Sequence, residues 1–343
     1  MKIALFANQV PFSHGGAEHH ISGLYGAFKD YGYDIELIRF PFKFSSISHI
    51  QNLMHHCGEL DANQFDGHSI DCAISLQFPS WGIRHDNHRI WVMHQHRAVY
   101  DLYDENQKSL TLKAFKKNVE SYDNDCFKKA KKVFANSVNV AKRLERYNNV
   151  RAMPIYHPPP SAKLFYAADS LDYIFYPSRL ESLKRQDLLI EAAAKLKSPV
   201  KILIGGVSGE FFRFDTLIPN NRLDERVEII GRFSEKEKYA LYARSLAVFF
   251  GPFDEDYGYI TLEAMLSSKP VITCVDSGGA LEFVKHQETG LVVESNAEAV
   301  AEAIDQLYFD KQKAVEMGKA GKAHFDACDI TWHSVCEKLL DDY

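Results

Sequence analysis

The sequence predicts an α/β protein built from two doubly wound domains, each with a parallel sheet. Short apolar runs typical of buried strands alternate with segments of helical character along the 343 residues. The alternation restarts after His157-Pro158-Pro159-Pro160, which can continue neither a helix nor a central strand. The chain is also long enough for two hydrophobic cores. We therefore expect one domain over residues 1–160 and a second over residues 161–328.

Each predicted element follows from this alternation. The first domain should hold a loop at 8–16, a helix at 17–31, and a long Lys-rich helix before its last strand. Two further helices should close the chain, and the carboxyl ends of the two sheets should face each other across a deep cleft. Strands are expected at 3–7, 35–40, 72–76, 90–94, 133–135, 173–176, 200–204, 227–230, 246–250, 270–273 and 290–293, and helices at 186–196, 235–243 and 260–267.

Composition narrows the function classes. The formal net charge is -6, with 25% charged and 46% hydrophobic residues, and general nucleic-acid binding normally needs a basic excess. No apolar stretch reaches the length of a membrane span, and the first residues run straight into a strand. The six cysteines include no CxxC pair. We expect a cytoplasmic protein that does not bind nucleic acid.

The segment from Phe253 to Met265 carries the strongest functional signal. Glu255 should lie in the loop at the carboxyl end of strand 246–250, and Glu263 should lie in the following helix. Open α/β sheets bind ligands at that edge. Gly258 allows a close backbone approach, and a helix start offers N–H groups to a phosphate. Two carboxylates beside such a helix suit a ligand with hydroxyls and phosphates, such as a nucleotide sugar.

Two cations and a glycine are expected at the same edge. Arg179 and Lys184 follow strand 173–176, where they could neutralise a diphosphate. The alternative is a pair of solvated surface charges. Gly231 and Arg232 follow strand 227–230 and could shape a pocket for a base, or form a plain turn. The Gly278-Gly279 turn, ahead of a predicted helix with Glu282, could hold an anion on backbone amides.

The first domain offers weaker candidates. Gly15 and Gly16 open its first helix and could present amides to a phosphate, or simply begin the helix. They do not form a GxGxxG fingerprint. His94 ends the strand at 90–94 and could contact a sugar or move a proton, although a structural donor is the common role of such a residue. The pairs His94/His96, His19/His20 and His55/His56 lack zinc-site spacing, so we expect no metal.

A Lys-rich helical region precedes the last strand of the first domain. Its usual explanation is a solvated helix face, and the alternative is a surface for anionic lipid or a lipid-linked pyrophosphate. We keep peripheral membrane contact as a prediction. The lysines are Lys113, Lys116, Lys117, Lys128, Lys129, Lys131 and Lys132.

Together these motifs resemble the family 4 retaining glycosyltransferases of the GT-B fold, which has two Rossmann-like domains. The resemblance covers most of the chain and is strongest from residue 173 to 293. It rests on the E-x7-E motif with its Leu262-Glu263-Ala264-Met265 tail, and on Lys269-Pro270-Val271-Ile272. Arg179 with Lys184, Gly231, Gly278-Gly279 and the Gly-Gly-Ala-Glu segment at Gly15 support it. One departure is Arg185, where the family usually has glycine, which leaves the loop shape open.

The resemblance implies a role for each site residue. Arg179 and Lys184 would bind the donor diphosphate, and Glu255 would hold sugar hydroxyls. Glu263 would bind the ribose, and His94 would contact the donor sugar. Backbone amides of Tyr259, Ile260 and Thr261 would meet sugar or phosphate, and a last helix within 329–343 would cross back onto the first domain.

The implied reaction is metal-free transfer of a sugar with retention of configuration, from a UDP- or GDP-sugar to a glycan or lipid-linked hydroxyl. No cofactor is expected, and polysaccharide or lipopolysaccharide synthesis is the implied context. Four alternatives stay open. Asp254 and Asp256 form a D-x-D string that could hold a divalent cation. The protein could also be a nucleotide-sugar epimerase, a non-catalytic binding subunit or, least in keeping with the glycine pattern, a nicotinamide oxidoreductase.

Overall fold

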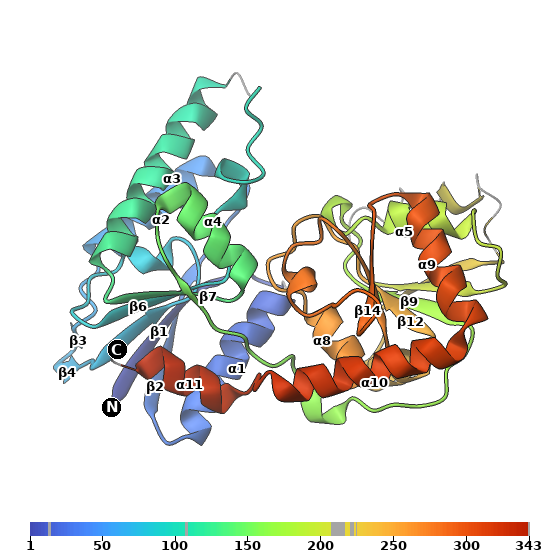
Figure 1. Cartoon of the computed structure of the whole chain (residues 1–343). Coiled ribbons are helices and arrows are strands. Elements are labelled where there is room, and N and C mark those ends of the chain that lie inside the picture. Colours follow the sequence, from blue (N-terminus) through green and yellow to red (C-terminus); the bar gives the residue numbers. More distant parts are fainter. Residues whose placement is uncertain (13–14, 107–108, 207–216, 220–222, 224, 342–343) are drawn as a thin grey trace. The chain divides into compact units, whose positions relative to one another are not determined.

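The computed structural model describes residues 1–12, 15–106, 109–206, 217–219, 223 and 225–341. It forms two compact units, each described by itself below (Figure 1). Unit 1 comprises Met1–His157 with Thr331–Tyr343, and unit 2 comprises Pro158–Ile330. The first boundary, expected after residue 160, therefore lies after His157. The cleft between the domains stays a prediction.

Unit 1 is built on a six-stranded parallel sheet. The first strand, β1 (Lys2–Gln9), lies between β2 (Asp34–Pro41) and β5 (Cys72–Ser75). The order of the sheet reverses beside β1, which makes the β1/β5 border a topological switch point. The remaining strands are β6 (His88–Val92), β7 (Lys132–Ala135) and β8 (Met153–Pro154), in that order.

Helices cover both faces of this sheet because successive strand side chains point to opposite sides. Ala4 and Phe6 belong to a core cluster with residues of α2 (Ile47–Glu59), α3 (Leu110–Lys129) and α4 (Val138–Asn148). Ile3, Leu5 and Ala7 belong to a second cluster with α1 (Gly16–Asp30) and α11 (Trp332–Leu340). The last helix of the chain thus packs in unit 1, against α1.

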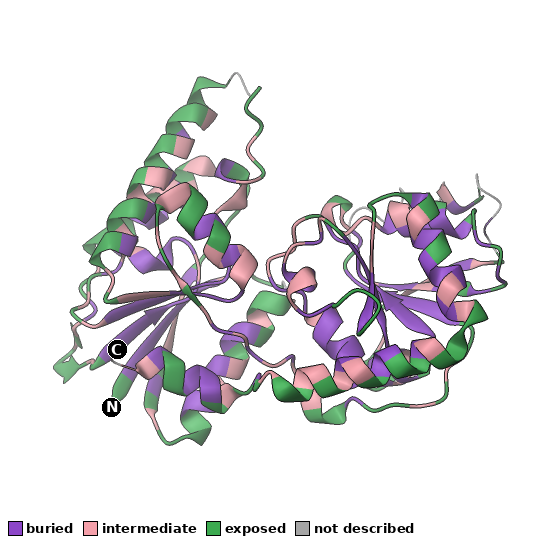
Figure 2. Ribbon diagram, in the orientation of Figure 1, coloured by how far each residue is buried: buried purple, intermediate pink, exposed green. Residues whose placement is uncertain are grey.

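Unit 2 repeats the plan with a second six-stranded parallel sheet. Its first strand, β9 (Tyr173–Pro177), lies between β10 (Lys201–Gly205) and β12 (Ala247–Phe249), so the switch point is the β9/β12 border. The central strands β9 and β12 are buried along their whole length (Figure 2). The other strands are β11 (Val227–Gly231), β13 (Val271–Cys274) and β14 (Gly290–Val293); the helices are α5 (Gln186–Ala193), α7 (Glu235–Arg244), α8 (Tyr259–Leu266), α9 (Ala297–Phe309) and α10 (Lys311–Ala327).

The prediction of two parallel-sheet α/β domains is confirmed, with local corrections. Three helices rather than two close the chain. The helix predicted to carry Glu282 is a short 3-10 turn, Gly279–Glu282. The sequence did not predict α2, α4, β8 or the hairpin of β3 (Gln64–Phe65) and β4 (His68–Ser69). The short strands bury too few apolar residues to be recognised from a local pattern.

Candidate functional site

The candidate site lies at the switch point of unit 2. The loop at residues 178–185 follows β9, and the loop at residues 250–258 follows β12. Because β9 and β12 are neighbouring parallel strands, both loops leave the same edge of the sheet. The first loop carries Arg179 and Lys184, and the second carries Glu255 and Gly258. The structure therefore places the two loops at one edge of the sheet, as the sequence predicts.

Lys184 and Glu255 form the central contact of this edge. The Lys184 ammonium donates to a carboxylate oxygen of Glu255, and the two side chains are only 16% and 20% exposed. The ammonium also lies 5.8 Å from the centre of the Phe250 ring. A buried lysine without a carboxylate or a phosphate would lose hydration without compensation. The pair is thus a ready site for an anion with hydroxyl groups.

Arg185 stands where the resemblance predicts glycine, and its side chain has a structural role that glycine could not fill. It has a left-handed backbone, with φ 53° and ψ 45°. Its guanidinium donates to both carboxylate oxygens of Asp276, at 2.8 and 2.6 Å. This fork holds the pKa of Asp276 below its ordinary value, and Ser295 donates to the same carboxylate at 2.5 Å. Arg185 therefore ties the β9 loop to the loops after β13 and β14.

Arg179 lies further from the other predicted groups. Its side chain is 59% exposed, and its guanidinium pairs with Glu181 at 3.2 Å. This geometry matches the solvated-charge alternative as well as it matches a phosphate ligand. Among the described contacts, the structure brings Lys184 and not Arg179 to Glu255.

Gly258 is needed for the start of α8. Its φ of 87° belongs to the left-handed region, and a Cβ there would lie 2.7 Å from the Phe250 ring. Of the three backbone amides expected to face a ligand, that of Thr261 donates to the Gly258 carbonyl at 3.1 Å. The Thr261 amide is thus already hydrogen-bonded in the first turn of the helix, where Tyr259 and Ile260 also lie, and the ligand contacts of all three amides stay predictions.

Glu263 lies on α8 but faces α7 rather than Glu255. Its buried carboxylate accepts from the Tyr242 hydroxyl at 2.6 Å and from the Lys238 ammonium at 3.5 Å. Burial raises the pKa of Glu263, against the opposing effects of Lys238 and Tyr242. The sequence analysis missed both partners. Lys238 and Tyr242 are four residues apart, so they lie on the same face of a helix. That spacing is the only sequence signal that could have indicated a shared contact.

The glycine turns have different roles. Gly231 is the last residue of β11 and has a left-handed backbone, with φ 66°. Its carbonyl accepts from the Gly206 amide at 2.9 Å, just after the end of β10. Arg232 follows directly. The Gly279 amide donates to the Glu255 carbonyl at 2.8 Å. That amide is therefore not available to an anion, and an anion-binding role for the rest of the turn stays a prediction. The turn instead supports the backbone of Glu255.

In unit 1, the predicted residues lie near the corresponding edge. Gly15 caps α1 with extended backbone, and Gly16 is the first residue of that helix. Residues 13–14 of the predicted loop lie outside the described residues. His94 follows β6 and is half-buried, and its Nδ1 donates to the Gln95 carbonyl at 2.7 Å, since a carbonyl can only accept.

The histidine pairs do not converge on a common point. The His96 ring packs between Phe78 and Phe115, and burial lowers its pKa to about 4. His20 is buried against Trp91. In the part of the chain that the structure describes, no group of three or more His, Cys, Asp or Glu side chains could hold a metal ion.

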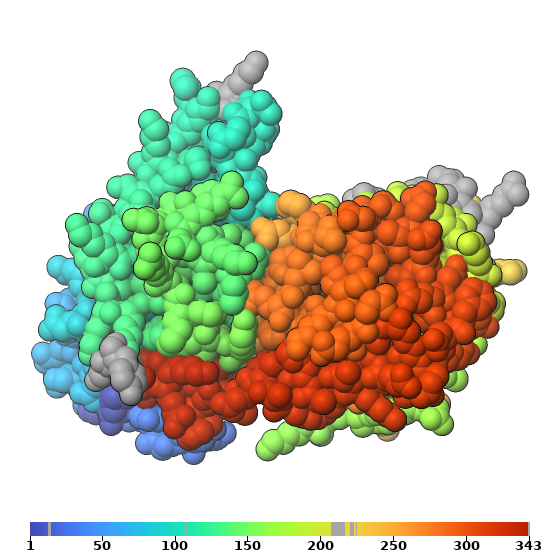
Figure 3. Space-filling view, in the orientation of Figure 1, coloured from blue at the N-terminus to red at the C-terminus, as the bar shows by residue number. Residues whose placement is uncertain are grey.

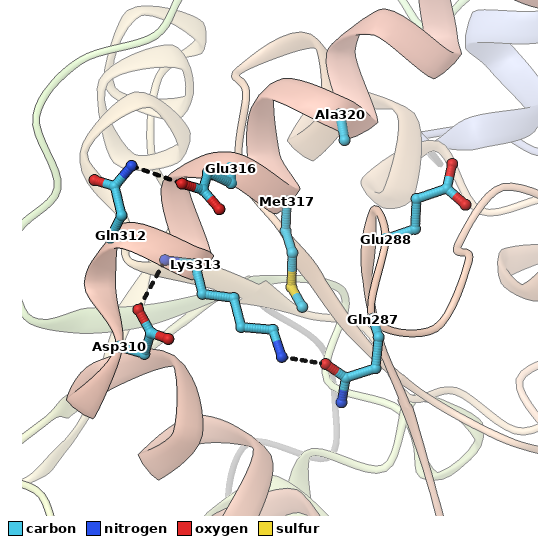
Figure 4. Close-up of a pocket in the computed structure, with 8 residues that line it drawn as sticks. All are labelled: Gln287, Glu288, Asp310, Gln312, Lys313, Glu316, Met317 and Ala320. Atoms are coloured by element: carbon cyan, nitrogen blue, oxygen red, sulfur yellow. Dashed lines mark hydrogen bonds between the residues drawn. The ribbon is translucent and has the colours of Figure 1, made fainter.

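Figure 4 shows a separate hollow between the loop before β14 and the start of α10. Gln287 and Glu288 precede β14, so this hollow lies at the amino end of that strand, away from the loops that follow β9 and β12. Lys313 donates to the Gln287 side chain across it. This hollow is therefore not the candidate site.

Part of the chain matches a known protein family. Residues 167–324 match the family model described as "Glycosyl transferases group 1". The match covers most of unit 2, including the loops with Lys184 and Glu255, and includes no residue of unit 1. The match spans less than half of the chain.

Two curated relatives align over a similar part of the chain. The alpha-1,3/1,6-mannosyltransferase ALG2 of Homo sapiens is 28% identical over 162 residues, which are 43% of this chain and 39% of that protein. A GDP-mannose-dependent alpha-(1-6)-phosphatidylinositol monomannoside mannosyltransferase of Mycobacterium tuberculosis is 32% identical over 179 residues, 48% of this chain and 45% of that protein. The chain thus matches less than half of the length of these relatives.

A solved structure aligns over nearly the whole chain. Anabaena Alr3699/HepE in complex with UDP and glucose superposes with a TM-score of 0.72, at 19% identity, over 99% of both chains. The fold is GT-B. Two parallel-sheet, Rossmann-like domains are the plan of this fold.

Proposed function

We propose that the protein is a glycosyltransferase that uses a nucleoside diphosphate sugar as donor. The observation that carries this proposal is the Lys184–Glu255 pair at the switch point of unit 2. It offers a cation for a diphosphate and a carboxylate for sugar hydroxyls at the edge where such sheets bind ligands. The family match over residues 167–324 includes this pair and supports the same function.

We assign the roles as follows. Lys184 binds the diphosphate, with Arg179 as a second, more mobile contact from its exposed position. Glu255 holds sugar hydroxyls, Glu263 binds the ribose, and His94 contacts the sugar from unit 1. Gly231 and Arg232 border the base.

The reaction that fits these roles proceeds with retention of configuration and without a metal, as in family 4 glycosyltransferases. Cationic charge and the start of α8 stabilise the departing diphosphate. The acceptor hydroxyl attacks from the leaving-group face while the sugar has oxocarbenium character, and a departing phosphate oxygen takes its proton. Glu255 stays on the sugar hydroxyls and is not a nucleophile.

The donor is proposed to be a UDP- or GDP-sugar. The Mycobacterium tuberculosis relative is described as GDP-mannose-dependent, and the Anabaena structure contains UDP and glucose. The acceptor is proposed to be a glycan or a lipid-linked intermediate of polysaccharide or lipopolysaccharide synthesis, met at the cytoplasmic face of a membrane.

Exposed lysines of α3 favour that acceptor. Lys113, Lys117, Lys128 and Lys129 are exposed on this helix, whose side chains form part of the surface of unit 1 in Figure 3. Lys116 and Lys132 are held internally, since they donate to the carbonyls of Val99 and Asp341. The exposed set could attract anionic lipid. Among the residues that the structure describes, no helix has both the length and the apolar character needed to cross a membrane.

A thermal-shift screen tests the donor. UDP, GDP, ADP and their common sugar conjugates would each be added with and without EDTA. Stabilisation by one nucleotide that survives EDTA supports the proposal. Stabilisation that disappears with the chelator would favour cation binding by Asp254 and Asp256.

Product analysis with the stabilising donor separates the remaining alternatives. Transfer that requires an acceptor supports the proposal, whereas conversion of the donor sugar without an acceptor would indicate an epimerase. Tight donor binding with neither hydrolysis nor transfer would indicate a binding subunit.

A further inference from the structure

The β9 loop holds three cations, and each is paired with a carboxylate. Arg179 pairs with Glu181, Lys184 with Glu255, and Arg185 with Asp276. The pairs differ in geometry. Arg185 and Asp276 make two hydrogen bonds that are supported by Ser295, whereas the Lys184 ammonium makes one hydrogen bond to Glu255. The Lys184–Glu255 pair combines the proposed ligand of the diphosphate with the proposed ligand of the sugar.

The backbones on both sides of this pair are fixed. The Phe253 amide donates to the Leu183 carbonyl at 2.8 Å, which ties the two loops together. The Glu255 amide donates to the Ser277 carbonyl at 3.2 Å, and its carbonyl accepts from Gly279 at 2.8 Å. The Lys184 carbonyl accepts from the buried Tyr176 hydroxyl. Rotation of the two side chains can therefore open the pair while these backbone hydrogen bonds stay in place.

The chemistry of the two groups makes an exchange of partners possible. An ammonium group is a point charge with three donors, so it can leave a carboxylate for a diphosphate that carries more negative charge. A neutral sugar offers no such replacement. Once released, the carboxylate is an acceptor that can take hydroxyl donors from a sugar.

We infer that Glu255 is an internal substitute for the donor diphosphate, which occupies Lys184 until a diphosphate displaces it. This inference rests on the proposed function and adds an order to it. The diphosphate binds Lys184 first, and only then is Glu255 released to hold the sugar hydroxyls. The site thereby accepts a sugar that carries a nucleoside diphosphate and excludes a free sugar.

Calorimetric titration with UDP and GDP, neither carrying a sugar, tests the exchange. Glu255→Gln keeps the shape of the side chain and removes the competing charge. We expect it to bind the nucleoside diphosphate about fivefold more tightly than the parent, since a partly exposed ion pair is worth about 1 kcal/mol. Asp256→Asn is the matched control, because it removes one charge from the adjacent half-buried position. It should change the affinity less than about twofold.

A double-variant comparison identifies the partner of Glu255. In a Lys184→Met background, Glu255→Gln should give no tightening. Equal tightening by Glu255→Gln and Asp256→Asn, an unchanged affinity in Glu255→Gln, or the same gain in the Lys184→Met background would overturn the inference while leaving donor binding intact. Absence of any nucleotide binding by the parent would overturn the proposed function and this inference with it. Thermal unfolding of each variant serves as the folding control.

Discussion

The two units share a topology but differ in the chemistry of their switch points. In unit 2, the loops after β9 and β12 bring together paired charges, with Lys184 on Glu255 and Arg185 on Asp276. In unit 1, the loop after β1 leads to the glycine start of α1, where His20 is buried. The comparison teaches that topology selects the edge of the sheet, whereas side chains decide which ligand it can bind.

Two buried histidines of unit 1, His20 and His157, have a structural role. The His20 ring lies 4.1 Å from the Trp91 ring and 4.0 Å from the His157 ring, and Trp332 lies 5.8 Å from His157. His157 is the last residue of unit 1 before the chain leaves it, and Trp332 begins the helix with which the chain returns. One aromatic cluster thus anchors both crossings of the chain.

The largest effect is expected from acidification, which should lower the stability of unit 1. Burial lowers the pKa of His88 and of His157 to about 3 and that of His96 to about 4, and it lowers the pKa of His20. The unfolded chain therefore binds more protons than the folded chain below pH 6.5, and stability falls as pH falls from 6.5 toward 4. Each fully buried histidine costs roughly 2 kcal/mol at pH 5.

One buried group of unit 1 has the opposite effect on stability as pH falls. Burial raises the pKa of Asp123 to about 7, so this group favours the folded state as pH falls. It offsets about one of the four histidines at pH 5, so a net loss of stability remains. All three tryptophans lie in unit 1, so urea unfolding followed by tryptophan fluorescence reports on this unit. A fluorescence midpoint that does not change between pH 7 and pH 5 would contradict the buried neutral cluster.

Removing the Lys184 charge should lower turnover, whereas removing an exposed charge of unit 1 should not. Lys184→Ala removes the charge that stabilises a leaving diphosphate, and we expect turnover to fall about a hundredfold, with a smaller loss of donor affinity. Lys142→Ala, at an exposed position of α4 in unit 1, serves as the control and should keep the turnover of the parent. Steady-state kinetics with the stabilising donor measures both. Unchanged turnover in Lys184→Ala would make this lysine a surface charge.

The docking of α11 can be tested with two glycines of α1. A Cβ at Gly23 would lie 2.2 Å from the Trp332 ring, whereas a Cβ at Gly26 would meet nothing within 4 Å. We expect Gly23→Ala to lower the free energy of unfolding by about 2 kcal/mol through overpacking. Gly26→Ala should raise it by up to about 1 kcal/mol, because alanine favours a helix. Equal midpoints of urea unfolding in the two variants would argue against the contact with Trp332.

The smallest effect is expected at the buried carboxylate of unit 2. Tyr242→Phe removes the 2.6 Å hydrogen bond to Glu263 and keeps the ring. We expect donor affinity to fall by about 1 kcal/mol, roughly fivefold, because Glu263 loses a fixed orientation toward the ribose. Glu263→Ala should weaken binding further. Calorimetry that gives the parent's affinity for Glu263→Ala would remove the ribose role.

The sequence predicted the edge of the site better than its contacts. Glu255 and Lys184 could be placed because each follows an apolar strand, and neighbouring parallel strands end at the same edge. The partners of Glu263 could not, because the rotation of α7 against α8 depends on packing of the whole unit. The Arg185–Asp276 fork was hidden for the same reason, since its residues are 91 positions apart. The sequence left an anion-binding role open for the Gly279 amide, because its bond to the Glu255 carbonyl exists only in the folded chain.

The most direct test of the central claim is hydrogen exchange measured by mass spectrometry, with and without the stabilising nucleotide sugar. A donor bound at the switch point of unit 2 should slow exchange in peptides that cover residues 178–185 and 250–260. Peptides that cover residues 285–288 and 310–320, around the hollow of Figure 4, should not change. Protection that appears only around that hollow, or an absence of protection in both loops, would contradict the account.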